Sequence, residues 1–347
     1  MKWHKTSLRV GTLALLVAML LRFALSGVFG SAWGIFAQPQ LAAFLIYSET
    51  GRTPAVPTET TIPTTTQPTP TEPVPTEPAP TEPTPITPVI PVNPVKPVFS
   101  AEDSQLFSLT YSFKIGTKPN VKKLLTQTLS WDLTGSKPTV LIIHSHATEA
   151  YTKTADSQYD NFAAYRTQDE NYNMVSIGDE LARLLEDQGI KVIHDRTAYD
   201  YLDYDNAYTK ARKSIQTHLK ENPSIKVVLD LHRDSAQNAD GSEWATKATV
   251  DGKDAAPLML VVGTNGSGQP HPNWQTNLSI AEKMAVLLER EDPGVCRPIQ
   301  VRYKHYNQDL CPGSLIVEVG TAGNTHQQAM NTMPALADAI IALAKGS

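Results

Sequence analysis

This chain has few cysteines, no excess of basic charge and, over one long stretch, no glycine. Its 347 residues include only two cysteines, Cys296 and Cys311, which is too few for a fold built on disulfides. The sequence alone leaves open whether these two pair with each other. The net charge of −5 provides no basic surface for nucleic acid, which is therefore not an expected partner.

Glycine is absent between residues 53 and 98, where 15 of the 26 prolines lie. The motif Pro-Thr-Glu-Pro recurs there, starting at Pro70, Pro75 and Pro80. Such a sequence forms neither a core nor a helix, and as polyproline II at ~3.1 Å per residue it would reach on the order of 140 Å. We predict that residues 48–98 are an extended linker.

Charged residues are scarce near the N-terminus, where Arg22 alone interrupts the apolar stretch between Val10 and Gln38. Basic residues precede this stretch, which predicts a cytoplasmic N-terminus and a single membrane anchor within residues 1–47. A signal peptide cleaved near Ala24 is the alternative. Apolar residues resume at 41–47, which favours the anchor, and both interpretations place the rest of the chain outside the cytoplasm.

Residues 99–347 are long enough for one sizeable α/β domain. Their pattern predicts a single, mostly parallel twisted sheet with helices on both faces, preceded by an extension over residues 99–135. The expected strands are 140–143, 190–194, 226–231, 258–263, 299–303 and 315–319, and the expected helices are 173–188, 206–220, 276–290 and 327–344.

Two of these strands run into histidine. Residues 140–143 lead to His144 and His146, and residues 227–231 lead to His232. Open α/β sheets bind ligands beyond the carboxyl ends of their strands, and imidazole is a common zinc ligand. Both His144 and His146 could reach one ion if their strand continued, whereas a turn after Ile143 would leave only one of them facing it.

A third strand, 315–319, carries Glu318 among apolar residues. A buried carboxylate needs a partner or a task. A salt bridge to Arg233 or to a lysine would explain it without catalysis. Beside a zinc-bound water, the same glutamate could accept a proton and return it to a leaving amine. Two histidine motifs and one glutamate together indicate a metallohydrolase.

The motifs resemble those of the stage II sporulation protein P family, in the same order over residues 100–345. The matching stretches are 141–151 (LIIHSHATEAY), 173–178 (NMVSIG), 230–234 (DLHRD), 306–310 (YNQDL), 317–320 (VEVG) and 323–325 (GNT).

This resemblance implies a zinc amidase-like fold and a zinc-dependent N-acetylmuramoyl-L-alanine amidase that thins septal peptidoglycan during engulfment, with endopeptidase activity on crosslinks as a further possibility. It also implies peptidoglycan as substrate, stage II sporulation proteins D and M as partners, and a place in the engulfing membrane of the mother cell. Another extracytoplasmic zinc metallopeptidase and a non-catalytic wall-binding scaffold are the alternatives.

Carried over to this chain, the resemblance makes Glu318 the catalytic acid and base, and His232 a zinc ligand together with the histidine of the first motif. Related zinc amidases use a glutamate as a further ligand. Here it could be Glu149, which follows the first motif, or Glu170, which lies just before the first predicted helix, and the sequence does not choose between them. Arg233 and Asp234 could orient the histidine or hold substrate.

Overall fold

The computed structural model describes residues 96–347 except 115, 117 and 239. The predicted anchor, residues 1–47, and nearly all of the predicted linker, residues 48–98, lie outside the described residues. Among the helices that are described, none combines the length and apolar character needed to cross a membrane.

Seven strands form the main sheet in the order β1-β8-β7-β9-β4-β2-β3. All neighbours are parallel except β7 and β9, so the predicted α/β fold with one mostly parallel sheet is confirmed, with one antiparallel pair that the sequence did not reveal. A separate two-stranded ribbon joins β5 and β6. The bounds are β1 Leu109–Tyr111, β2 Val140–Ile143, β3 Val192–His194, β4 Val227–Asp234, β5 Ala248–Val250, β6 Lys253–Ala255, β7 Leu258–Gly263, β8 Ile299–Arg302 and β9 Ser314–Thr321.

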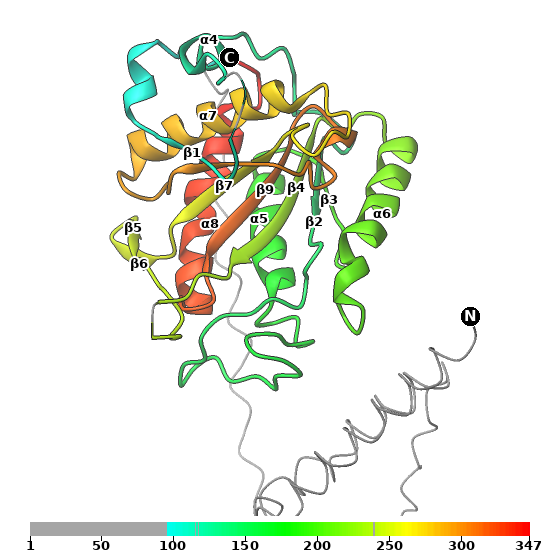
Figure 1. Ribbon diagram of the computed structural model, residues 1–347, viewed down its shortest axis with the longest axis vertical. Coiled ribbons are helices and arrows are strands. Elements are labelled where there is room, and N and C mark those ends of the chain that lie inside the picture. The colour runs from blue at the N-terminus through cyan, green and yellow to red at the C-terminus, as the bar shows by residue number, and fades with distance from the viewer. Residues whose placement is uncertain (1–95, 115, 117, 239) are drawn as a thin grey trace, which may run out of the picture. The chain divides into compact units, whose positions relative to one another are not determined.

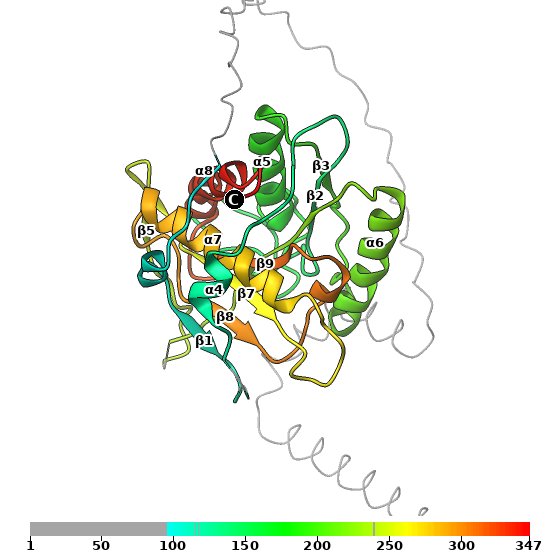
Figure 2. The same ribbon diagram turned by 90° about the horizontal axis from the view of Figure 1, so that it is seen from above.

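Helices cover both faces of this sheet (Figure 1). Figure 2 shows α5 and α8 on one side of the sheet and α6 on the other. Helix α7 packs on the same side as α5 and α8. The α-helices are α4 Val121–Leu125, α5 Met174–Asp187, α6 Ala207–Glu221, α7 Trp274–Glu291 and α8 His326–Ala342, and the short 3-10 turns are η1 Glu102–Gln105, η2 Tyr204–Asn206 and η3 Gln308–Leu310.

Alternation along the central strands decides which side chains face which helices. In β4, Leu229 and Leu231 pack in the main core beneath α5, α7 and α8. Asp230 and His232 point to the opposite face, because successive side chains of a strand alternate. That face is the one on which α6 packs. The sheet therefore directs the polar residues of its central strands toward α6.

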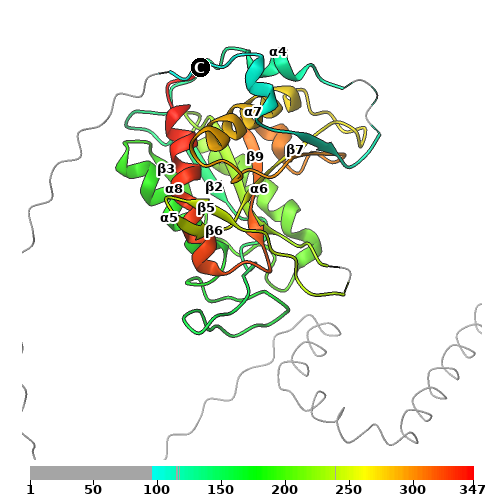
Figure 3. The same ribbon diagram turned by 90° about the vertical axis from the view of Figure 1, so that its left-hand side faces the viewer.

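Helix ends are fixed by the side chains that precede them. The Asn173 side chain accepts a hydrogen bond from the Val175 N–H at 2.9 Å and caps α5. Thr325 and Gln328 form a capping box at the start of α8. Figure 3 shows α8 running beside the β5–β6 ribbon, with which it is in contact. These caps confirm the predicted starts of both helices to within one residue.

The N-terminal extension is part of the folded unit. Its strand β1 pairs in parallel with β8 and becomes the edge of the main sheet. Its short helix α4 packs on α7, where the buried Lys283 ammonium donates a hydrogen bond to the Leu125 carbonyl oxygen. The sequence predicted that this extension packs on the domain but not that it adds a strand.

Candidate metal centre

Three side chains with metal-binding atoms converge at the ends of β2 and β4. His146, Glu149 and His232 are all buried, and one ligand atom from each lies within 4.8 Å of the other two. The Glu149 carboxylate stands between the imidazoles, with Oε1 at 3.6 Å from His146 Nδ1 and Oε2 at 3.3 Å from His232 Nδ1. Two imidazoles and a carboxylate in this arrangement could hold a metal ion.

The turn that carries His146 is fixed by a carboxylate on the neighbouring strand. Strand β2 ends at Ile143, and the chain turns at once. Asp230 of β4 accepts hydrogen bonds from the Ser145 N–H at 2.7 Å and from the Ser145 hydroxyl at 2.6 Å. The Glu149 N–H then donates to the His146 carbonyl oxygen at 3.1 Å. By holding Ser145, Asp230 thus fixes the turn that carries both His146 and Glu149.

Two arginines hold the Glu149 carboxylate. Arg166 approaches Oε1 at 3.2 Å, and the Arg233 guanidinium lies 3.7 Å from the same oxygen. The Arg233 N–H also donates to Oε2 at 3.3 Å. Burial alone would raise the pKa of Glu149, but Arg233 and then His232 outweigh it and hold the pKa well below its usual range. The carboxylate is therefore ionised, as a metal ligand must be.

The two imidazoles differ in protonation. Burial, and then the charge on His232, lowers the pKa of His146 to about 4, so His146 is neutral and keeps a free lone pair. Burial opposes the charge on His232 as well, but Asp230, at 2.9 Å from Nε2, and Glu149 raise its pKa well above the usual value. A metal bound here would displace a proton from His232.

Glu318 lies beside this group on β9. It is the register partner of His232 across the parallel β4–β9 pair, so both side chains point to the α6 face. Its Oε2 atom is buried and has no hydrogen-bond partner among the described residues. Burial raises the pKa of Glu318 to about 8, against a smaller opposing effect of the charge on His232.

The salt bridge that could have explained Glu318 does not form. Among the ion pairs of the described residues, none includes Glu318, and Arg233 is engaged elsewhere. Its guanidinium donates to the carbonyl oxygens of Ala150 and Tyr165, both at 3.0 Å. Glu318 is thus a half-buried residue with a buried Oε2 atom, a raised pKa and no ion-pair partner among the described residues, which is typical of a group that handles protons.

Two tyrosines wall the imidazoles on the side of α6. The Tyr204 ring stacks on His146 with a centroid distance of 4.5 Å and an angle of 11°. The Tyr208 ring stacks on His232 at 6.2 Å and 12°, and meets His146 edge-on at 5.3 Å. Neither tyrosine was singled out by the sequence, and no local signal marks them, because their role depends on where α6 crosses the sheet.

The other candidate residues lie outside the three-residue group. His144 is buried beside β4, with Nδ1 at 3.1 Å from the Leu231 carbonyl oxygen and Nε2 at 2.8 Å from His194 Nε2. Glu170 has a half-exposed side chain that is paired with Arg196. Of the two glutamates that the sequence left open, the structure brings Glu149 to the histidines.

Asp234 and the two cysteines also lie outside the group of His146, Glu149 and His232. Asp234, at the end of β4, pairs with Arg297 at 2.9 Å rather than with a histidine. Cys296 and Cys311 are both free thiols. Asp230 is the residue that the sequence reasoning missed although a signal was present, because it is a charged residue within an apolar strand, just as Glu318 is.

Comparisons with known proteins add a family. The sequence profile of the family described as stage II sporulation protein P matches residues 94–341. A curated relative, stage II sporulation protein P of Bacillus subtilis (strain 168), is 29% identical over 216 residues, which cover 59% of this chain and 51% of the relative. The chain therefore spans about half the length of that relative.

Solved structures of amidases are similar at low scores. The N-acetylmuramoyl-L-alanine amidase AmiC2 of Nostoc punctiforme has a TM-score of 0.34 and 14% identity, over 59% of this chain and 97% of that one. The CwlD amidase of Clostridioides difficile, solved in complex with the GerS lipoprotein, has a TM-score of 0.34 and 14% identity, over 58% and 96%. The N-acetylmuramyl-L-alanine amidase Ami1 of Mycobacterium smegmatis has 0.34 and 13%, over 61% and 95%.

Scores at this level carry no argument about the activity of this chain. The family profile spans more than half of the chain, and the matched residues 94–341 include His146, Glu149, His232 and Glu318. The resemblance predicted from the motifs is thereby confirmed, and the chain belongs to the stage II sporulation protein P family.

Proposed function

We propose that this protein is a zinc-dependent peptidoglycan hydrolase that cleaves the amide bond between N-acetylmuramic acid and L-alanine. The observation that carries the proposal is the buried group of His146, Glu149 and His232 with Glu318 next to it. Two imidazoles and one carboxylate are the ligand types that catalytic zinc sites use, with a further position open to water. The bond itself is inferred from membership of the family.

Zinc bound by His146, Glu149 and His232 would lower the pKa of a water toward about 7 and polarise the substrate carbonyl. Glu318 accepts the proton of the attacking water and then donates it to the departing nitrogen of L-alanine. Its pKa of about 8 suits both steps, because a group that titrates near the working pH both takes and returns a proton.

The surrounding residues hold the reacting groups in place. Arg166 and Arg233 keep Glu149 ionised and fixed between the histidines. Asp230 anchors the turn that bears His146. Tyr204 and Tyr208 cover the imidazole faces and reduce contact with water, which strengthens the electrostatic interactions within the site.

Digestion of purified peptidoglycan by the full-length chain tests this proposal. We expect chelation to abolish the release of stem peptides and added zinc to restore it. Mass spectrometry of the products locates the new amine. An amine on L-alanine supports an amidase, and an amine within the crosslink identifies an endopeptidase instead. Failure to bind zinc, together with no cleavage, would contradict the proposed hydrolase and favour the alternative of a non-catalytic wall-binding scaffold.

The setting of this activity is proposed from the sequence. An anchor in residues 1–47 and an extended linker in 48–98 would attach the enzyme to the engulfing membrane of the mother cell and let it reach into the wall. Stage II sporulation proteins D and M are predicted partners on the basis of the family alone. Protease accessibility of the folded region in intact cells, compared with lysed cells, tests on which side of the membrane it lies.

A further inference from the structure

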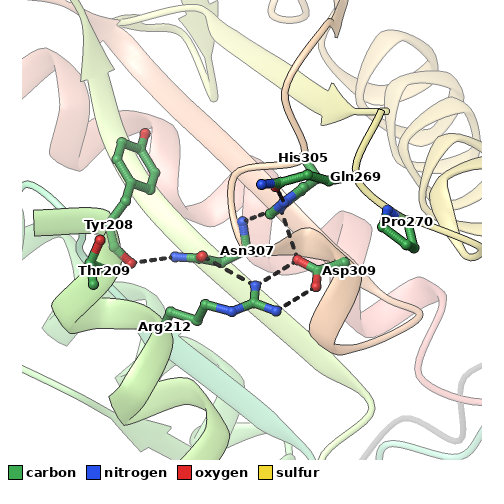
Figure 4. Close-up of a pocket in the computed structure, with 8 residues that line it drawn as sticks. All are labelled: Tyr208, Thr209, Arg212, Gln269, Pro270, His305, Asn307 and Asp309. Atoms are coloured by element: carbon green, nitrogen blue, oxygen red, sulfur yellow. Dashed lines mark hydrogen bonds and ion pairs between the residues drawn. The ribbon is translucent and has the colours of Figure 1, made fainter. Parts of the chain in front are cut away.

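A cavity of about 530 Å³ lies beside α6, next to the candidate metal centre. It opens between the first turns of α6 and the loop that follows β8, and Figure 4 shows the side chains that line it. Those that matter here are Tyr208, Thr209, Arg212, Gln269, Asn307 and Asp309. Its volume is within the range of ligand-binding pockets.

One residue links this cavity to the candidate metal centre: Figure 4 shows the Tyr208 backbone oxygen facing Asn307, with the ring pointing away from the other lining side chains. Tyr208 lines the cavity, and its ring stacks on His232 at 6.2 Å. Tyr306, in the loop on the other side, meets the Tyr208 ring at 5.6 Å. Both tyrosines pack on the face of β7 and β9 that also presents Glu318. A substrate with its scissile bond at the metal centre could therefore extend past Tyr208 into the cavity.

The walls of the cavity are held in place before any ligand binds. Arg212 of α6 grips Asp309 with two hydrogen bonds of 2.8 and 2.7 Å. The Asn307 amide donates to the Tyr208 carbonyl oxygen at 2.8 Å. Tyr306 and Asn307 have φ angles of 48° and 64°, in the left-handed region that costs energy for residues other than glycine. The loop is thus clamped onto α6 in a strained conformation.

The chemistry of the walls suits a polar peptide. Asp309 pairs with Arg212 at 2.7 Å and with His305 at 2.9 Å, so its charge is balanced within the wall and the cavity does not select a ligand of one sign. The Asn307 amide already donates to Tyr208, and Gln269 Oε1 contacts His305 Nε2. The Gln269 amide nitrogen and the exposed Thr209 hydroxyl can still pair with the C=O and N–H groups of an extended chain. Tyr208 and His305 are the ring-bearing residues of the lining, and the Tyr208 ring already stacks on His232, which leaves little ring surface on which a sugar could stack.

We propose that this cavity is the subsite for the stem peptide, on the leaving-group side of the scissile amide. This proposal rests on the proposed amidase function. The ligand class is a short peptide that carries both carboxylate and amino groups. Arg212 would share its guanidinium between Asp309 and a peptide carboxylate, since the guanidinium has five N–H donors, of which Asp309 takes two and Asn307 a third.

Two substrates separate this role from a general effect on catalysis. N-acetylmuramoyl-L-alanine extends only one residue beyond the scissile bond, whereas the same compound with a tetrapeptide stem would reach the cavity. For Arg212→Gln we expect the ratio of the two kcat/KM values, long over short, to fall about 10-fold through the KM for the long substrate. The matched control is Arg183→Gln on α5, an exposed arginine paired with Glu180 and Asp187, which should keep the wild-type ratio.

Gln269→Ala and Thr209→Val test the same cavity independently of whether Arg212→Gln folds. Both residues are exposed, so their replacement should not affect folding. In each we expect a smaller fall of the same ratio, and in the double variant a larger one. An unchanged ratio in Arg212→Gln and in the double variant would overturn the subsite while leaving the amidase in place. A wild-type chain that cleaves neither substrate would overturn the proposed function and the subsite with it.

Discussion

Replacement of Glu318 by glutamine isolates proton transfer from every other property of the site. Glutamine has nearly the same size and can still form hydrogen bonds, but it can neither take a proton from water nor give one to a leaving amine. Glu318 is not in the group of His146, Glu149 and His232, so zinc binding should persist. We expect kcat to fall by about 10² to 10⁴, which is ~3–5 kcal/mol of barrier.

The fold should tolerate this change. Glu318 makes no ion pair among the described residues, and its Oε2 atom has no hydrogen-bond partner to lose. Because burial raises its pKa to about 8, its ionised form is less stable in the folded state than in the unfolded state. A neutral amide removes that cost, so the free energy of unfolding at neutral pH should be equal to or greater than that of the wild type.

Three readouts on one preparation test this reasoning. Muropeptide cleavage gives kcat, atomic absorption gives the zinc content, and urea unfolding gives stability. Glu180→Gln is the matched control, since Glu180 lies on α5, paired with Arg183, and should retain full activity. A Glu318→Gln variant with zinc content and stability like the wild type and a kcat within a few-fold of it would refute the role of Glu318.

Three further outcomes are expected. His232→Ala should lose both zinc and activity, because it removes a ligand and the imidazole that lies between Asp230 and Glu149; normal zinc content by atomic absorption would contradict its role. Gly178→Ala should destabilise the fold by about 1–3 kcal/mol in urea unfolding, since the new Cβ would lie 2.5 Å from His194 Nε2 and 2.7 Å from His144 Nε2; unchanged stability would mean that these rings move aside freely. Burial raises the pKa of Glu282, which has no hydrogen-bond partner, to about 8. Its stabilising effect is thus present below pH 4.5 and lost as the pH rises to 8, so Glu282→Gln should be more stable than the wild type at pH 8 by a few kcal/mol at most but not at pH 4; an equal difference at both pH values would contradict this sign.

The strands and helices of the sheet could be predicted because each is an apolar run or an amphipathic period bounded by a cap or a glycine. Strand β7 matches its predicted bounds, Leu258–Gly263. Its direction could not be predicted, since a short buried run is the same whether it pairs in parallel or antiparallel. Strand β4 was expected to end at Leu231 but continues to Asp234, because its pairing with β9 extends that far.

The site could be predicted only where a residue stands out from its own strand. His232 and Glu318 do so, and the sheet register makes them neighbours. The choice between Glu149 and Glu170, and between His144 and His146, depends on the turn after β2. That turn is anchored by Asp230 some 85 residues away in the chain. Such long-range contacts leave no local pattern, and the same is true of Tyr208.

In the proposed reaction, water activated between the candidate metal centre and Glu318 attacks the lactyl carbonyl of N-acetylmuramic acid. Digestion of purified peptidoglycan in heavy-oxygen water, followed by mass spectrometry of the products, tests it most directly. We predict one heavy oxygen atom in the new lactyl carboxylate and a free amine on L-alanine, both lost in Glu318→Gln. Heavy oxygen found only in the carboxylates of cleaved crosslinks, or in no product, would contradict the account.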